Sequence, residues 1–183
     1  MARSPYLEAK VNRWCKEEKK ELVIDDCDTD TFNIIVDYMY GSPIPGNVVT
    51  SAFDKSSVPT EDRKNLASLK KYFSGKFERL TKLLRMSDML QMIDLKCEVE
   101  ELLVKFLEDT WFNVDTARLR LCSAVLVLID PAELYNCEKL ILTCARKYST
   151  CGVVPDLKMA KDIVQEIPQF AAALLVAYAN KNV

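Results

Sequence analysis

The sequence contains no histidine among its 183 residues, and this absence excludes several classes of chemistry at once. Ser-His-Asp and Cys-His nucleophile pairs, His-ligated zinc and a histidine general base all need an imidazole. Glycine (4 residues) and proline (7 residues) are also scarce, which excludes low-complexity and disordered classes of protein. We therefore predict a packed, helix-rich globular protein.

An excess of one sign of charge is absent as well, because 25 Lys and Arg residues oppose 27 Asp and Glu residues. The net charge of -2 favours neither nucleic acid nor an anionic membrane as a partner. No window reaches the roughly 20 unbroken apolar residues that span a bilayer, and residues 1–20 lack the apolar core of a signal peptide. We therefore expect a soluble, intracellular protein, cytoplasmic or nuclear, with no membrane contact.

The sequence also lacks closely spaced pairs of cysteines, since none of its 7 cysteines lie at Cys-x-x-Cys spacing. Neither a zinc ribbon nor a disulfide framework is indicated, and reduced thiols fit the odd number. Cys137 and Cys144 would share a helix face, but a free cysteine is usually a small buried hydrophobe. No acid, base and nucleophile come together by motif, so we predict no enzyme, no metal and no cofactor.

Apolar residues at helical spacing run along most of the chain. The spacing predicts a helix over residues 6–19 and a second one from Asp28 or Thr29 to a stop at Gly41 and Pro43. Between them, residues 21–24 (ELVI) form an apolar run closed by two aspartates, which is typical of a short strand. Residues 42–59 contain three prolines and no helical period, so we expect an extended connection there.

Helical spacing returns after residue 60 and continues to the end of the chain. We expect two consecutive helices up to residue 90, broken around Ser74 and Gly75, and an amphipathic helix from residue 94. The apolar run over residues 114–129 would also suit a strand, and we predict a helix. Pro131 is expected to open the following helix, and Pro168 to separate two terminal ones.

The most basic stretch of the chain has seven Lys or Arg residues between residues 63 and 82, with Glu78 as its one acid. Such a stretch suggests a phosphate-binding face. A solvated helix surface explains it better, because no aromatic stacking platform or groove motif accompanies it. Association with nucleic acid through this stretch is therefore the third of three functional hypotheses.

Four segments, in this order, resemble the BTB/POZ family in the version that continues into a BACK-like helical extension: SPYLEAKVNRW, EEKKELVIDDCDTDTFNIIVDYMYG, LLRMSDMLQMIDLKCEVEELLV and AELYNCEKLILTCARKY. The resemblance implies a mostly α fold with an α+β remnant. A BTB/POZ-like helical cluster with one short strand would be followed by BACK-like helices. It implies a partial BTB/POZ-like domain over residues 1–110, with an insertion at about 46–76, and a BACK-like extension over residues 111–183.

Membership of this family would imply a protein-interaction module without catalysis. The expected partners are a second copy in a homodimer, a related BTB protein, or a cullin scaffold for which the chain is the substrate adaptor of a ubiquitin ligase. The resemblance places the candidate partner-binding residues on the first helix: Tyr6, Leu7, Lys10, Val11 and Asn12.

Two departures from the family pattern leave an alternative open. Only residues 1–3 precede Ser4, where family members begin with a strand pair and a helix, so we expect an N-terminally truncated domain. The family's cullin contact uses a hydrophobic-any-Glu motif, and the matching Lys10, Val11 and Asn12 lack its anchor and its acid. The second hypothesis is therefore a truncated or degenerate BTB paralogue without cullin binding.

Overall fold

The computed structural model describes residues 4–16, 24, 27–48, 66–108, 117–150 and 165–181, which form helices and no strand. The helices are α1 (Pro5–Lys16), α2 (Thr29–Met39), α4 (Leu66–Met89), α5 (Ile93–Glu108), α6 (Ala117–Leu134), α7 (Glu138–Thr150) and α9 (Pro168–Lys181). The predicted mostly α fold is confirmed. Of the strand predicted at residues 21–24, only Ile24 lies within the described residues, and it has no regular secondary structure.

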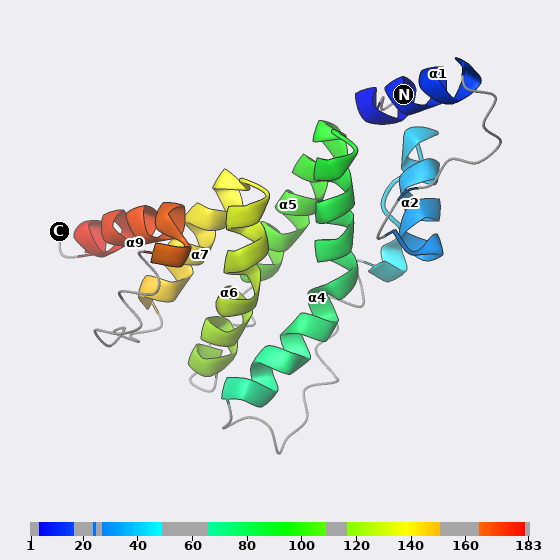
Figure 1. The fold of residues 1–183 in the computed structure, drawn as a ribbon. Coiled ribbons are helices and arrows are strands. Elements are labelled where there is room, and N and C mark those ends of the chain that lie inside the picture. The colour runs from blue at the N-terminus through cyan, green and yellow to red at the C-terminus, as the bar shows by residue number, and fades with distance from the viewer. Residues whose placement is uncertain are drawn as a thin grey trace.

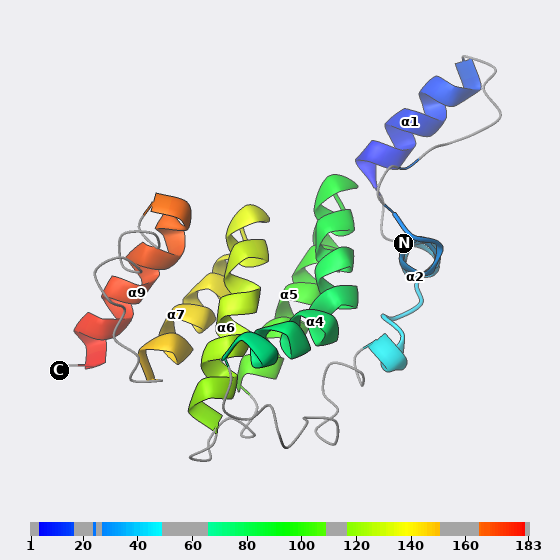
Figure 2. The same cartoon turned by 60° about the horizontal axis from the view of Figure 1, so that its bottom comes forward.

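The helices from α4 onward form a stack of helical hairpins (Figure 1). Helix α4 lies beside α6, and α5 lies beside α7, so that the hairpin α4–α5 packs against the hairpin α6–α7. Helix α9 packs on α7 at one end of the stack, and α2 packs on α4. Figure 2 shows α1 and α9 at opposite ends of the molecule.

Both hairpins turn in the same way. Gln91 (φ 56°) and Asn136 (φ 51°) take the left-handed conformation two residues after α4 and α6 end. The next residue, Met92 or Cys137, donates its N–H at 2.8 Å to the carbonyl five residues earlier. This is the Schellman motif, and the burial of Met92 and Cys137 supplies the apolar contact that accompanies it. The two hairpins therefore share one type of turn.

One continuous hydrophobic core runs through the stack, on both sides of the domain boundary predicted near residue 110. Its aromatic centre lies between α4 and α5, where Phe77 meets Phe106 edge to face at 4.8 Å and stacks with Phe73 at 5.8 Å. All three rings are buried. Such pairs stabilise a core by about 0.5–1.5 kcal/mol beyond the area that they bury.

Carboxylates from one hairpin bind the start of a helix farther along the chain. Glu100 of α5 is 8% exposed and accepts the N–H of Leu140 in α7 at 3.0 Å. Glu133 of α6 accepts the N–H groups of Gln169 and Phe170 in α9 at 2.8 and 3.1 Å. The first N–H groups of a helix have no partner within it, so these side chains satisfy donors that would otherwise be unpaired.

The break predicted around Ser74 and Gly75 is wrong, because α4 continues without interruption from Leu66 to Met89. Leu69, Phe73 and Phe77 lie on one side of this helix at four-residue spacing and are fully buried. Their burial outweighs the roughly 1 kcal/mol that a glycine costs in a helix interior. Residues 66–76, placed in an insertion by the resemblance, thus lie in a core helix.

The helix start predicted at Pro131 is also wrong. Pro131 lies in the last turn of α6, which confirms the helix predicted over residues 114–129 from residue 117 onward; residues 114–116 lie outside the described residues. A proline so near the end removes one hydrogen bond only, and its own carbonyl still accepts the N–H of Tyr135 at 3.0 Å. The signal that ends the helix is Asn136, a residue type that tolerates positive φ.

Helices α2 and α9 begin where the sequence predicts. Asp28 caps α2 and accepts the N–H of Thr31 at 2.8 Å, while Gly41 (φ 92°) ends the helix. Helix α9 begins at Pro168. The helix predicted before Pro168 lies mostly outside the described residues, as does most of the connection predicted over residues 42–59, where residues 46–48 form one helical turn.

Candidate protein-interaction surface

Helix α1 contacts the stack at its first turn. The Ser4 hydroxyl donates to the carbonyl of Leu90, at the end of α4, at 2.5 Å and accepts the N–H of Leu7 at 3.2 Å. Ser4 is therefore both the cap of α1 and its link to α4. Tyr6 and Leu7 are partly buried and pack against the core. The remainder of α1 extends away from α4 (Figure 1).

The structure brings two of the five predicted partner-binding residues into contact. The Lys10 ammonium lies 5.0 Å from the centre of the Tyr6 ring, a cation–π geometry between residues one turn apart. Asn12 is exposed. Positions two apart on a helix do not face each other, so Lys10 and Asn12 lie on different sides of α1. Leu7 and Val11, four residues apart, occupy neighbouring positions in the helix.

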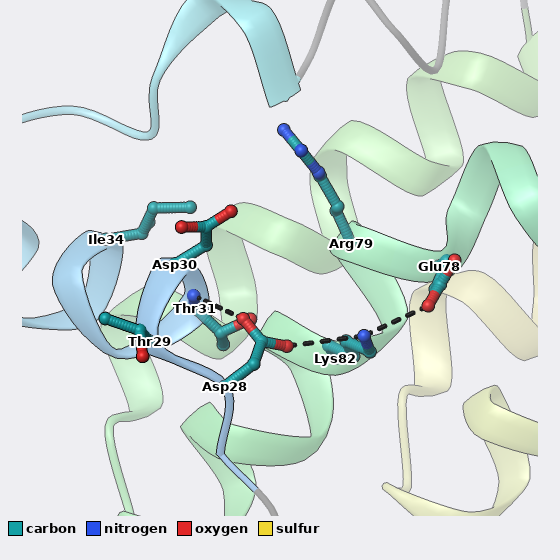
Figure 3. Close-up of a pocket in the computed structure, with 8 residues that line it drawn as sticks. All are labelled: Asp28, Thr29, Asp30, Thr31, Ile34, Glu78, Arg79 and Lys82. Carbon is teal, nitrogen blue, oxygen red and sulfur yellow. Dashed lines mark hydrogen bonds and ion pairs between the residues drawn. The ribbon is translucent and has the colours of Figure 1, made fainter.

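A pocket of about 450 Å³ lies between the start of α2 and the middle of α4 (Figure 3). Three of its charged side chains bind one another. Asp28 pairs with Lys82 at 3.3 Å, and Lys82 pairs with Glu78 at 3.0 Å. Asp28 also caps α2, so a single carboxylate joins the start of α2 to α4. These contacts give the pocket a structural role in holding α2 on the stack.

Both members of the α2–α4 ion pair have shifted pKa values. The hydrogen bonds from Thr31, followed by the contact with Lys82, lower the pKa of Asp28. Hydrogen bonds to Glu78 and Asp28 raise the pKa of Lys82. Both shifts favour the charged forms, so the pair persists across the neutral range.

The described part of the basic stretch is partly neutralised. Lys82 binds two carboxylates, and the Lys76 ammonium lies 5.2 Å from the centre of the Tyr72 ring. Lys70, Lys71 and Arg79 are exposed on α4. A solvated helix surface, the interpretation that the sequence favours, agrees with these contacts.

The buried thiols are unsuited to nucleophilic chemistry. Burial, followed by the nearby Glu100, raises the pKa of Cys137 to about 12, and burial raises the pKa of Cys144 well above its usual range. A thiol acts as a nucleophile only as the thiolate, so these two cysteines are components of the core. In the described ranges no three His, Cys, Asp or Glu side chains gather where they could hold a metal ion.

No helix in the described part of the chain has the length and the apolar character needed to cross a membrane. Large apolar side chains are nevertheless exposed at several points of the surface, among them Tyr40 at the end of α2 and Ile93 at the start of α5. The others are Leu134, Leu142, Leu175 and Val176, on α6, α7 and α9.

A second candidate surface, missed by the sequence reasoning, lies between α7 and α9. Here Ile141 and Leu142 of α7 and Ala172, Ala173 and Val176 of α9 line an open groove of about 440 Å³, with Asn136, Glu138 and Gln169 around it. Leu175 of α9 is 71% exposed. The available signal was α9's lack of charged residues before Lys181, which leaves it no polar face.

Residues 1–56 match the family model of the BTB/POZ domain. The resemblance stated from the sequence is thus confirmed for the segment that contains α1, α2 and the predicted partner-binding residues. No curated protein and no solved structure matches the chain significantly. BTB/POZ domains are protein-interaction modules, and the match supports this class of function.

Proposed function

Because residues 1–56 match the BTB/POZ domain, we propose that the chain is an adaptor that binds a partner protein through α1. The observation that carries the proposal is the way α1 is attached. Ser4, Tyr6 and Leu7 hold one end of the helix on the stack, while exposed positions such as Asn12 face solvent. Helices α4 and α5, in the BTB/POZ-like part of the resemblance, and α6 to α9, in its BACK-like part, would then act as the support.

The first partner to test is the amino-terminal domain of a cullin, and the α1 sequence permits a gain-of-binding experiment. The positions that match the family's hydrophobic-any-Glu motif are Lys10, Val11 and Asn12. The double substitution Lys10→Leu with Asn12→Glu restores the anchor and the acid. If α1 docks on a cullin, this variant should bind at least about tenfold more tightly than the native chain, which corresponds to about 1.4 kcal/mol.

Calorimetric titration of the full chain with a purified cullin amino-terminal domain measures this difference. A loss-of-binding arm uses Asn12→Arg, which adds a long charged side chain to the proposed contact. Its matched control is Asn33→Arg, at another exposed asparagine, on α2. The control should bind as the native chain does, and equal binding by all four proteins would contradict docking through α1.

The second form of the proposal has a related BTB protein as the partner. It predicts a mixed complex in light scattering that Asn12→Arg weakens and Asn33→Arg does not. If neither partner binds, the alternative of a degenerate BTB paralogue without cullin binding is the better description.

A further inference from the structure

We infer that the outer face of α9 is a self-association surface, on which a second copy of this chain packs its own α9 in antiparallel orientation. This surface lies at the far end of the molecule from α1 (Figures 1 and 2), and the inference does not depend on the function proposed for α1. Four observations support it.

The first observation is that α9 is apolar on two sides. Phe170, Ala171 and Leu174 are buried against the stack. On the outside, Ala172, Leu175, Val176 and Ala179 are exposed and follow one another at spacings of three, one and three residues. Positions at this spacing form one stripe on a helix, of the kind that packs against another helix.

The second observation concerns the other helices of the stack. Each hairpin covers apolar surface of the previous one: α6 covers α4, α7 covers α5, and α9 covers α7. The end of such a stack normally presents a polar face to water. Here it presents the side chains of Leu142, Leu175 and Val176, which are 52%, 71% and 59% exposed, beside the groove between α7 and α9.

The third observation indicates that the partner is a second copy of this chain, because the outer stripe has the same order of side-chain sizes in both directions along the helix. It is small, large, large, small, with its midpoint between Leu175 and Val176. A two-fold axis through this midpoint sets Leu175 opposite Val176 of the second copy, and Ala172 opposite its Ala179. The stripe is therefore complementary to itself, as an interface with two-fold symmetry requires, and the alanines allow the two helices to approach closely.

The fourth observation is the distribution of charge. The stripe itself has none, while Glu138 and Glu166 lie at exposed positions near the start of α9, and Lys181, the one charged residue of the helix, is its last. Antiparallel pairing brings the acidic end of each copy toward the Lys181 end of the other. It also sets the two helix dipoles in opposite directions, whereas parallel pairing would place like charges together.

Sedimentation equilibrium of the full chain tests the proposal. The native chain should approach twice its mass of 20.9 kDa at concentrations of about 100 µM. Leu175→Glu places two carboxylates beside the two-fold axis and should leave a monomer at the same concentration. The matched control is Ile93→Glu, since Ile93 is equally exposed (72%) at the start of α5, and this variant should associate as the native chain does.

Disulfide trapping tests the orientation and does not rely on the stability of a charged variant. Oxidised Leu175→Cys protein should give a 175–175 link between copies, identified by peptide mapping so that native cysteines do not interfere. Ala172→Cys alone should give none, because antiparallel pairing separates the two sites by about 10 Å along the axis, beyond the about 7 Å that a disulfide spans. Mixed with Ala179→Cys protein, it should give a 172–179 link.

Each possible result has a defined meaning. A native chain that stays monomeric, or a mass that Leu175→Glu does not lower, overturns the proposal. A 172–172 link as efficient as the 175–175 link overturns the antiparallel orientation. Association that Asn12→Arg abolishes and Leu175→Glu leaves intact would place the dimer at α1, outside the surface inferred here.

Discussion

The N-terminal segment and the helical stack differ in what they contribute to the protein. The segment with α1 and α2 carries the match to a known domain, and the described contacts of α1 with the stack include the Ser4 hydroxyl and the partly buried Tyr6 and Leu7. The stack from α4 to α9 contains most of the buried core and lies outside the matched residues. The difference shows that recognisable sequence and folding energy need not lie in the same part of a chain.

The largest expected effect compares the two regions by stability. Phe77→Ala removes the ring that contacts both Phe73 and Phe106, and it should lower the free energy of unfolding by about 3–5 kcal/mol. Tyr6→Ala in α1 should cost less than about 1 kcal/mol, because Tyr6 is only partly buried. Urea unfolding followed by circular dichroism measures both. Equal losses would mean that α1 is as well packed as the stack.

The next effect concerns the carboxylate that joins the two hairpins. Glu100→Ala leaves the N–H of Leu140 without its buried acceptor, and the expected loss of stability is about 1–3 kcal/mol. Glu100→Gln keeps an oxygen acceptor of nearly the same shape and should lose less. The same unfolding measurement separates the two variants. A Gln variant as unstable as the Ala variant would show that the negative charge, and not the acceptor, is required.

A smaller effect, dependent on pH, is expected at the contact between α2 and α4. Asp28 has a lowered pKa in the folded protein, so its contribution to stability is present above its ordinary value of 3.8 and is lost as the pH falls through the folded value. The Asp28→Asn variant should therefore be less stable than the native chain at neutral pH. Below about pH 4 its urea unfolding midpoint should decrease less steeply than that of the native chain. Asp30→Asn, which removes another carboxylate of the same pocket and leaves the Asp28–Lys82 pair in place, is the matched control.

The last prediction compares how fast two native cysteines are alkylated, and it needs no substitution. Cys27, just before α2, is partly buried, whereas Cys144 in α7 is fully buried, and burial raises the pKa of both thiols. At neutral pH, Cys27 should be alkylated faster than Cys144. The ratio of the two rates should exceed about one hundred if Cys144 reacts only when the stack opens. Mass spectrometry of the digested protein measures both rates. Similar rates would show that α7 opens as readily as the N-terminal segment.

The sequence predicted the helices well where one side of the helix is buried and its ends carry a familiar signal. Asp28, Gly41 and Pro168 are such signals, and α2 and α9 begin or end at them. The prediction failed at Pro131, because a proline is compatible with both the first and the last turn of a helix. It also could not find the turn at Gln91, since a glutamine gives no local sign of positive φ.

The candidate surfaces were predictable to different degrees. The resemblance led to α1, because the SPY segment lies in the part that matches the family. The groove between α7 and α9 could not be found in this way, because its lining comes from two segments of the chain, residues 136–142 and 169–176. Apolar spacing identifies the apolar stripes of a helix, but it does not show which of them are buried. Helix α9 has two such stripes, and one of them is exposed.

The contacts of Glu100 and Glu133 bear on how the chain acquires its structure. The first turn of α7 takes a hydrogen-bond acceptor from α5, and the first turn of α9 takes one from α6. Each unit thus supplies acceptors for a helix farther along the chain, so the hairpins depend on one another. A fragment cut between α5 and α6 would leave amide groups of α7 exposed, so the stack should unfold as one cooperative body and not hairpin by hairpin.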